Sequence, residues 1–347
     1  MQTRLIFVIG VDTHRDRHAL ALVACPSGAC LAEAIIVADG RGYAAALALA
    51  REQAPGARAW AIEGTGSYGK GLARSLAGQG ERVLEVERPK REGRRGRAKS
   101  DRLDALRAAR SLLGEDKLAF PRAGGERESL RVLLAIRTSA ASARKVALNQ
   151  LRALLVTCPE PLRAELCLLT RARLLRRCRE LAPEREHDSE LRTTLLALGL
   201  LAARIEALTA EKRALERELL ALAQKIAPAL LDEQGIGPIG AAQAIVSWSY
   251  KGRFRSEAAF ARFAGAAPIP ASSGQTVRHR LDRGGDRKLN SVLHQIVLTR
   301  RKHDSRTTAH IERRKREGKS ERDAVRCLKR FVARRLFRLL EATVAAA

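Results

Sequence analysis

Short apolar runs separated by turns dominate the first part of the chain. Runs of strand length occupy residues 5–11 and 18–24, with a turn at residues 13–17 between them. Pro26-Ser27-Gly28 forms the next turn, and a third strand is expected at residues 31–38. The pattern then predicts, in order, an alanine-rich helix after Gly42, a strand at 58–62, a helix after Gly69 and a strand at 82–86.

The order of these elements narrows the fold class. Three antiparallel strands run into alternating β and α units, which is the order of a ribonuclease H-like (RuvC-like) domain. Residues 1–120 are expected to form this domain. The fold class of the whole chain is therefore predicted as α/β plus α, because the remaining residues read as helical.

The middle of the chain, residues 121–228, is predicted to be a helical, coiled-coil connector. It is rich in Leu, Ala, Arg and Glu, with breaks near Pro159, Pro161 and Pro183. Its last helix carries an apolar seam with alternating steps of four and three residues: Leu201, Ile205, Leu208, Lys212, Leu215, Leu219, Leu222 and Ile226. Such a seam pairs with a second helix, either within the chain as a helical hairpin or in a partner subunit.

Residues 229–347 are expected to form a third, mostly helical domain. Its first segment, LLDEQGIGPIGAAQAI at residues 230–245, resembles a helix-hairpin-helix motif. The turn between Gly235 and Gly237 would present backbone N–H groups to a DNA phosphate. A plain helical turn is the alternative interpretation.

Charge points to a polyanionic partner. The chain has 347 residues, a formal net charge of +27 and a pI of about 11.1, which ordinary metabolic enzymes do not have. Residues 278–338 contain 21 Lys and Arg against 7 Asp and Glu, a net charge of +14, so the charge is concentrated as on a docking surface. Nine more Lys and Arg lie in residues 88–107. The candidate nucleic-acid-binding side chains are Arg94, Arg95, Arg97, Lys99, Arg278, Arg280, Arg283, Arg287 and Lys288.

Other classes of protein fit the composition poorly. The sequence shows no signal peptide and no 18-residue apolar run, so membrane insertion is not expected and a cytoplasmic location is predicted. The six cysteines form no CxxC pair, which favours reduced, mostly buried thiols over a zinc site. Aromatic residues make up only 3% of the chain, so recognition is expected mainly through Arg contacts to phosphate and to helical shape.

Four carboxylates occupy predicted element ends. Asp12 ends the first strand, Glu63 ends the fourth, and Asp101 and Asp104 share one face of a helix that begins after Ser100, a good N-cap, with Gly114 as a stop. Carboxylates are preferred ligands of Mg²⁺, and two such ions assist phosphoryl transfer. Taken singly, each acid reads as a helix N-terminal or turn residue. Their joint placement predicts a metal site.

Two loops have a chemical and a structural interpretation. Residues 64–69, GTGSYG, fit a dinucleotide-binding fingerprint, but the adjacent Glu63 would repel a pyrophosphate, so a tight strand-to-helix turn is preferred. Residues 268–276, PIPASSGQT, form a loop beside an Arg-rich segment. A hydroxyl of Ser272 or Ser273 could attack a DNA phosphate there, although most Ser-Ser-Gly stretches are only turns.

Together these blocks resemble a known family. GVDTH, IEGTGSYG, KSDRLDA, GIGPIGA, FAGAAPIPASSGQTVRHRLDRGGDRKLN and EGKSERDAVRCLKRF are similar, in sequence and order, to the DEDD transposases of the insertion sequence 110 family. The resemblance implies a RuvC-like domain whose DEDD residues are Asp12, Glu63, Asp101 and Asp104, with Mg²⁺. It also implies a C-terminal transposase domain with a nucleophilic serine, Ser272 or Ser273.

The resemblance further implies how the protein works. It predicts excision and integration of an insertion sequence, guided by a structured non-coding RNA from the element. It also predicts a homo-oligomer, a dimer or tetramer, in which the RuvC-like site meets the serine of a partner subunit. Two alternatives remain: a Holliday-junction nuclease that uses water, and a non-enzymatic nucleic-acid-binding protein.

Overall fold

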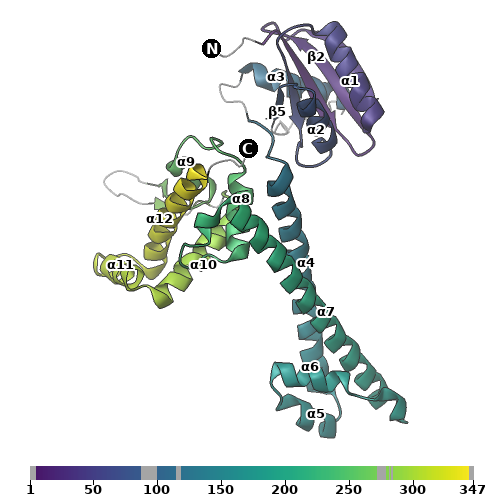
Figure 1. Cartoon of the computed structure of the whole chain (residues 1–347), viewed down its shortest axis with the longest axis vertical. Coiled ribbons are helices and arrows are strands. Elements are labelled where there is room, and N and C mark those ends of the chain that lie inside the picture. Colours follow the sequence, from purple (N-terminus) through teal and green to yellow (C-terminus); the bar gives the residue numbers. More distant parts are fainter. Residues whose placement is uncertain are drawn as a thin grey trace. The chain divides into compact units, whose positions relative to one another are not determined.

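The chain divides into two compact units, Met1–Arg122 and Ala123–Ala347. The structure is a computed structural model that describes residues 5–86, 100–114, 119–271, 279–280, 282 and 284–343. Figure 1 labels the helices and strands of both units. Each unit has its own hydrophobic core, and each is considered by itself.

The first unit is built on a five-stranded mixed sheet (Figure 1). The strands are β1 (Phe7–Thr13), β2 (Arg17–Ala24), β3 (Cys30–Val37), β4 (Arg58–Glu63) and β5 (Val83–Val86), and their order in the sheet is β3-β2-β1-β4-β5. β1 pairs antiparallel with β2 and parallel with β4. This mixed sheet, with the order β-β-β-α-β-α-β-α along the chain, fits a ribonuclease H-like domain, as the sequence predicted.

Helices cover both faces of this sheet. They are α1 (Gly40–Gln53), α2 (Lys70–Gly78) and α3 (Asp101–Ser111), the last followed by the 3₁₀ turn Leu112–Gly114. Buried side chains of α1 and α2 pack on one face with Ile9 and Val11, and those of α3 pack on the other with Val8. The two faces alternate along β1 because successive strand residues point to opposite sides.

Two helix starts differ from the prediction. α1 begins at Gly40, before Gly42, because the side chain of Asp39 accepts a hydrogen bond from the Gly42 nitrogen and so caps the helix earlier. Ser100 does occupy the N-cap position of α3, but its hydroxyl makes no capping hydrogen bond.

The second unit is helical, as predicted for the rest of the chain. Its elements are α4 (Gly125–Thr157), α5 (Glu160–Cys167), α6 (Arg171–Arg179), the 3₁₀ turn Pro183–Arg185, α7 (Ser189–Ile226), the 3₁₀ turn Pro228–Leu230, α8 (Pro238–Trp248), α9 (Glu257–Phe263), α10 (Arg287–His303), α11 (Ser305–Arg316) and α12 (Glu321–Ala342). A two-stranded ribbon, β6 (Ile269–Pro270) and β7 (His279–Arg280), follows α9.

The long helices α4 and α7 run side by side (Figure 1). Arg137 of α4 donates to Glu216 of α7 at 2.8 Å, and Arg144 donates to Thr209 at 2.8 Å. Of the two partners that the seam of α7 allows, the structure therefore contains the intramolecular one. By length and composition alone, α7 is also apolar enough to cross a membrane. One such helix is weak evidence for a membrane span, because α7 packs against α4.

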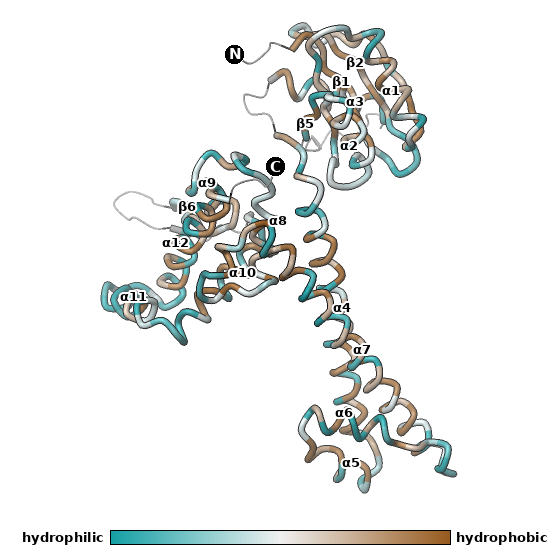
Figure 2. Tube along the Cα trace, viewed as in Figure 1, coloured by the Kyte–Doolittle hydropathy of each residue, from teal (hydrophilic) through white to brown (hydrophobic). Residues whose placement is uncertain are grey.

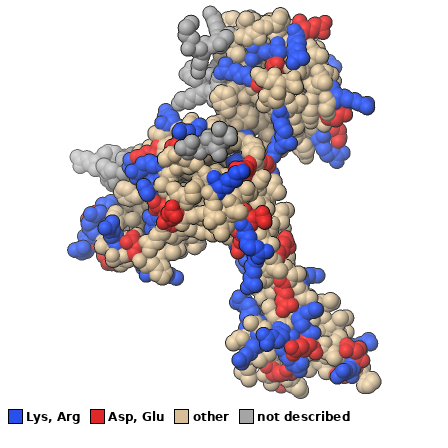
Figure 3. Space-filling view, viewed as in Figure 1, with Lys and Arg blue, Asp and Glu red and all other residues tan. Residues whose placement is uncertain are grey.

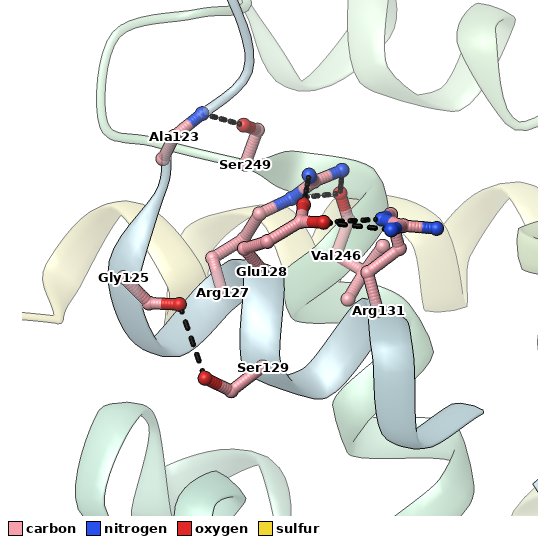
Figure 4. A network of polar contacts seen from close by, with 8 residues as sticks. All are labelled: Ala123, Gly125, Arg127, Glu128, Ser129, Arg131, Val246 and Ser249. Atoms are coloured by element: carbon pink, nitrogen blue, oxygen red, sulfur yellow. Dashed lines mark hydrogen bonds and ion pairs between the residues drawn. The ribbon is translucent and has the colours of Figure 1, made fainter. Parts of the chain in front are cut away.

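The start of α4 is hydrogen-bonded to the end of α8. Figure 4 shows the Arg127 guanidinium donating to the backbone oxygen of Val246, while Glu128 lies between Arg127 and Arg131. The backbone nitrogen of Ala123 donates to the Ser249 hydroxyl at 3.0 Å. These contacts join α4 to the largest core of the unit, in which α8 and α12 are buried.

The cysteines are free, but the prediction that most are buried is wrong. Only Cys158 and Cys178 are buried, whereas Cys30 and Cys167 are exposed. Cys30 begins the edge strand β3, most of whose side chains are not buried, so an apolar residue there does not reach a core.

Candidate functional site

The pairing of β1 with β4 brings two of the predicted carboxylates together. In the parallel register Val11 lies opposite Ile62, so Asp12 and Glu63 are the next residues along the two strands. Residues at equivalent positions of parallel strands point to the same face of a sheet. Asp12 and Glu63 are both buried, with 4% and 7% of their surface exposed.

The third and fourth carboxylates arrive from α3, which lies on that same face. Alternation along β1 places Asp12 on the side of Val8, which packs with Ala108 and Ala109 of α3. Asp101 and Asp104 lie in the first turn of α3. The sheet and the helix therefore direct carboxylates from three separate segments toward one end of the unit.

Small residues set how closely α3 approaches the sheet. A β-carbon at Gly10 would lie 2.0 Å from the backbone oxygen of Ala105 and 2.5 Å from the backbone nitrogen of Ala109. Ala105 is fully buried and packs against Ala19 and Ala21 of β2. Because Gly10 precedes Asp12 by two residues, this contact fixes the first turn of α3 next to the end of β1.

A histidine joins the acidic residues at the end of β1. His14 Nε2 lies 3.1 Å from Asp12 Oδ2 and 3.5 Å from Asp101 Oδ1. One ligand atom from each of these three residues lies within 4.8 Å of the others, a spacing that would hold a metal ion. His14 is not among the site residues predicted from the sequence, although its position two residues after Asp12 in GVDTH was a usable signal.

The other two carboxylates are placed differently. Asp104 Oδ1 accepts a hydrogen bond from Arg107 Nη1 at 2.7 Å, and Asp104 is not a member of the three-residue group. Glu63 lies beside Asp12 in the sheet but is likewise outside this group. The structure thus brings Asp12 and Asp101 together around His14. Glu63 is the neighbour of Asp12 across the sheet, and Asp104 follows Asp101 in the first turn of α3.

The donor set fits a divalent cation. Two carboxylates and one imidazole, drawn from a strand end and a helix start, are the ligand types that divalent metals take in proteins. Carboxylate oxygens suit both Mg²⁺ and Mn²⁺, whereas an imidazole ligand favours Mn²⁺. A carboxylate as buried as Asp12 also requires a positively charged or hydrogen-bonding partner.

The second histidine of this region has a structural role. His18 of β2 is fully buried, and its ring stacks on Tyr43 of α1 with 6.0 Å between the centroids. Burial lowers the pKa of His18, so its neutral form is favoured. It faces the opposite side of the sheet from Asp12 and does not join the acidic group.

The GTGSYG loop is a strand-to-helix turn, as predicted. Gly64 has a φ of +63°, and its backbone oxygen accepts hydrogen bonds from the nitrogens of Ser67 and Gly69. A β-carbon at Gly69 would lie 2.9 Å from the Glu63 backbone oxygen, which also accepts a hydrogen bond from the Thr13 hydroxyl. The glycines therefore allow α2 to begin directly against the ends of β1 and β4.

An open hollow adjoins the metal-binding group. It has a volume of about 710 Å³ and is lined by His14, Asp101, Arg17, the ion pair of Arg15 with Asp16, and the apolar residues 35–37 of β3. The hollow therefore leaves His14 and Asp101 open on the β3 side of the sheet.

The candidate nucleic-acid contacts of the second unit are partly described. Gly235 has a φ of +88° and packs closely on Ile296 of α10. This backbone geometry alone explains why position 235 is a glycine, with no need for a bound ligand. Gly237 is the N-cap of α8 with open space beside it, Arg280 ends β7, and Arg287 and Lys288 are exposed in the first turn of α10.

Several predicted residues lie outside the described part of the chain. These are the two candidate serines and six of the candidate basic residues: Ser272, Ser273, Arg94, Arg95, Arg97, Lys99, Arg278 and Arg283.

Comparison with known proteins agrees with this architecture. Residues 9–159 match the model of the DEDD transposases of IS110, and residues 227–312 match the model described as the transposase IS116/IS110/IS902 family. The chain is 29% identical over 143 residues to "Insertion element IS110 uncharacterized 43.6 kDa protein" of Streptomyces coelicolor. That match spans 40% of this chain and 35% of the relative, about a third of its length.

The fold, the acidic strand ends and the two matched regions are those of DEDD transposases. Both matching models describe transposases of the IS110 type, which confirms the resemblance found in the sequence.

Proposed function

We propose that the protein is an enzyme that excises and integrates an insertion sequence by cutting and joining DNA strands. The observation that carries this proposal is the group of Asp12, His14 and Asp101 at the open end of the sheet. If Asp101 only stabilised the start of α3, it would need no buried carboxylate beside it at the end of a strand. A phosphoryl-transfer site does require oxygen ligands that converge from several elements. Membership of a transposase family supports DNA as the substrate.

Asp12, Glu63, Asp101 and Asp104 would hold the cations of this site, which we propose are Mg²⁺. A bound cation supplies activation of the attacking oxygen and neutralises charge on the leaving oxygen. His14 would add an imidazole ligand beside the Asp12 carboxylate, since its Nε2 already lies 3.1 Å from Asp12 Oδ2. Arg15 and Arg17, which line the adjoining hollow, would hold the phosphates of the DNA strand.

The strand-transfer step is assigned to Ser272 or Ser273. The serine oxygen would form a bond to a DNA phosphorus while an ester oxygen of the strand leaves, and a hydroxyl of the receiving strand would later displace the serine. The support for this role is the sequence block APIPASSGQTVRHR, which is part of the family resemblance. A structured RNA guide, a homo-oligomer and a cytoplasmic, nucleoid-associated location belong to the same proposal.

The proposal also divides the chain by role. Residues 1–120 would act as the RuvC-like catalytic domain and residues 229–347 as the transposase domain. Residues 121–228 would connect them through the paired helices α4 and α7. In this division the helix-hairpin-helix-like turn at Gly235 and Gly237 contacts DNA phosphate.

Excision of the element in cells tests the proposal, read by PCR across the circular junction. Wild type should give the junction, and neither Asp12→Ala nor the double variant Ser272→Ala, Ser273→Ala should. Glu52→Gln is the matched control, because Glu52 is an exposed acid of α1 on the other face of the sheet.

The remaining outcomes favour the alternatives. A junction that survives the serine changes but not Asp12→Ala would indicate a nuclease that uses water. A junction that survives both changes would contradict the site assignment and favour a non-enzymatic nucleic-acid-binding protein.

A further inference from the structure

The second unit contains a cavity of about 750 Å³ that the acidic site does not involve. Residues 265–268, the end of β7, α11 and α12 line it. Eight of its lining residues are Lys or Arg and two are Asp. Figure 2 shows α11 as hydrophilic along most of its length, and Figure 3 shows Lys and Arg gathered over that region. We call this space the α11–α12 cavity.

Among the described residues, one cation of the α11–α12 cavity is buried without a counter-ion. Lys329 is only 9% exposed, and its Nζ donates to Asn290 Oδ1 at 2.5 Å. Asn290 is held by its own donation to the Ala264 oxygen. Among the described residues no carboxylate lies within ion-pair distance of Lys329. Burial, with a smaller contribution from Arg326, lowers the pKa of Lys329, so an anion in the cavity would stabilise its charged form.

The two aspartates that line the α11–α12 cavity already accept hydrogen bonds, Asp282 from the Gly284 backbone nitrogen at 2.8 Å. Asp323 accepts hydrogen bonds from the Ser320 hydroxyl at 2.6 Å and from Arg326 Nη1 at 2.8 Å. Arg314 pairs with Glu317, and Arg334 pairs with Glu257. Arg280 and Arg330 line the cavity with no acidic partner in the described part of the chain. The unbalanced positive charge therefore faces the cavity and favours an anionic ligand.

An aromatic side chain stands at the rim of the same cavity. Phe331 follows Arg330 on α12 and is 56% exposed, unusually high for a residue whose apolar ring gains from burial. Its ring meets that of His310 edge to face, with 6.0 Å between the centroids. Exposed aromatic rings beside unpaired cations are the combination that binds unstacked bases together with their phosphates.

We propose that the α11–α12 cavity binds one unpaired nucleotide of a DNA or RNA strand, with its phosphate at Lys329 and Arg330 and its base on Phe331. Bases inside a duplex are stacked on their neighbours and cannot reach such a ring. The volume is within the range of pockets that take small ligands. The inference rests on the proposed function only in taking nucleic acid as the ligand. It adds one stacking contact to the recognition through Arg that the composition predicts.

The test is fluorescence anisotropy of the full-length protein with a labelled oligonucleotide, as single-stranded DNA, single-stranded RNA and duplex DNA. Phe331→Leu should weaken binding of at least one single strand about tenfold and leave the duplex unchanged, since one stacked base contributes on that order. Phe331→Tyr should restore it. The strand type that responds identifies the ligand.

Charge variants test the phosphate half of the site. Arg330→Gln should lower the slope of log affinity against log salt by about 0.7 for the single strand, which corresponds to one lost phosphate contact. Arg322→Gln is the matched control, because Arg322 is an exposed arginine of α12 that does not line the cavity. Arg330 is only half-buried, so this variant tests the site even where Lys329→Gln prevents folding.

Two results would overturn the inference. One is unchanged binding of both single strands by Phe331→Leu; the other is an equal loss for single strands and duplex. These measurements need no catalysis and should give the same values in an Asp12→Ala background. Failure of excision would therefore contradict the proposed function without affecting the binding result. Unchanged binding by Phe331→Leu would contradict the nucleotide site without affecting the excision result.

Discussion

Gly10 of β1 and Ala105 of α3 lie so close that a β-carbon on the glycine would be 2.0 Å from the alanine backbone oxygen. The contact is between backbone and backbone, so neither partner has a flexible side chain that can move aside. It sets the height of α3 above the sheet and, two residues later, the position of Asp12 relative to Asp101.

We expect Gly10→Ala to lower the free energy of unfolding of the first unit by about 3 kcal/mol, because the added methyl group must push α3 away from β1. Chemical denaturation followed by circular dichroism measures this change. Gly78→Ala is the control, since Gly78 of α2 has open space where a β-carbon would lie and should change stability by less than about 1 kcal/mol. Equal stability of Gly10→Ala and wild type would contradict the close approach of α3.

Metal binding should be visible as stabilisation of the folded protein. A cation that binds only the folded state at a hundredfold excess over its Kd adds about 2.7 kcal/mol. We expect Mg²⁺ or Mn²⁺ to raise the melting temperature of wild type and of Glu52→Gln, and to have no effect on Asp12→Ala or Asp101→Asn. An equal rise in all four proteins would show that the cations bind elsewhere.

His14 should affect the choice of metal. An imidazole ligand favours Mn²⁺ over Mg²⁺, so His14→Ala should weaken Mn²⁺ binding more than Mg²⁺ binding. Calorimetric titration of wild type and His14→Ala with each ion measures the two affinities. Equal losses for both ions would assign His14 a positioning role without coordination.

Thiol reactivity should separate the cysteines by burial. Burial raises the pKa of Cys178 to about 11, so only about one thiol in a hundred is ionised at pH 9. Iodoacetamide should therefore modify the exposed Cys30 and Cys167 first and leave Cys178 unmodified in the folded protein, as read by mass spectrometry. The unfolded thiol ionises at lower pH, so Cys178 favours the folded state below about pH 9 and loses this contribution as the pH rises toward 11. Early modification of Cys178 would contradict its place in the core between α6 and α7.

The exposed basic residues at the start of α10 should contribute to nucleic-acid affinity without contributing to stability. Replacing both Arg287 and Lys288 by Ala should lower the slope of log affinity against log salt by about 2 for duplex DNA, with the melting temperature nearly unchanged. Arg322→Ala, on α12, serves as the comparison. A slope equal to that of wild type would remove both residues from the interface.

The sequence by itself determined the elements of the first unit and their order. Apolar runs bounded by turns place five strands within one or two residues of those observed, since strand burial and turn chemistry depend on local residue types. It also determined which acids end strands or begin a helix, and the ordered motifs that identify the family. The seam of α7 predicted a helical partner but left its identity open.

Only the tertiary structure decided which residues meet. Parallel pairing of β1 with β4 aligned Asp12 with Glu63, and the contact at Gly10 brought Asp101 to His14, residues 87 positions apart in the chain. It also chose α4 as the partner of α7, and it gathered Lys329, Arg330 and Phe331 around a cavity shared with α11. Such contacts depend on long-range packing of whole elements, and no local pattern of residues encodes that packing.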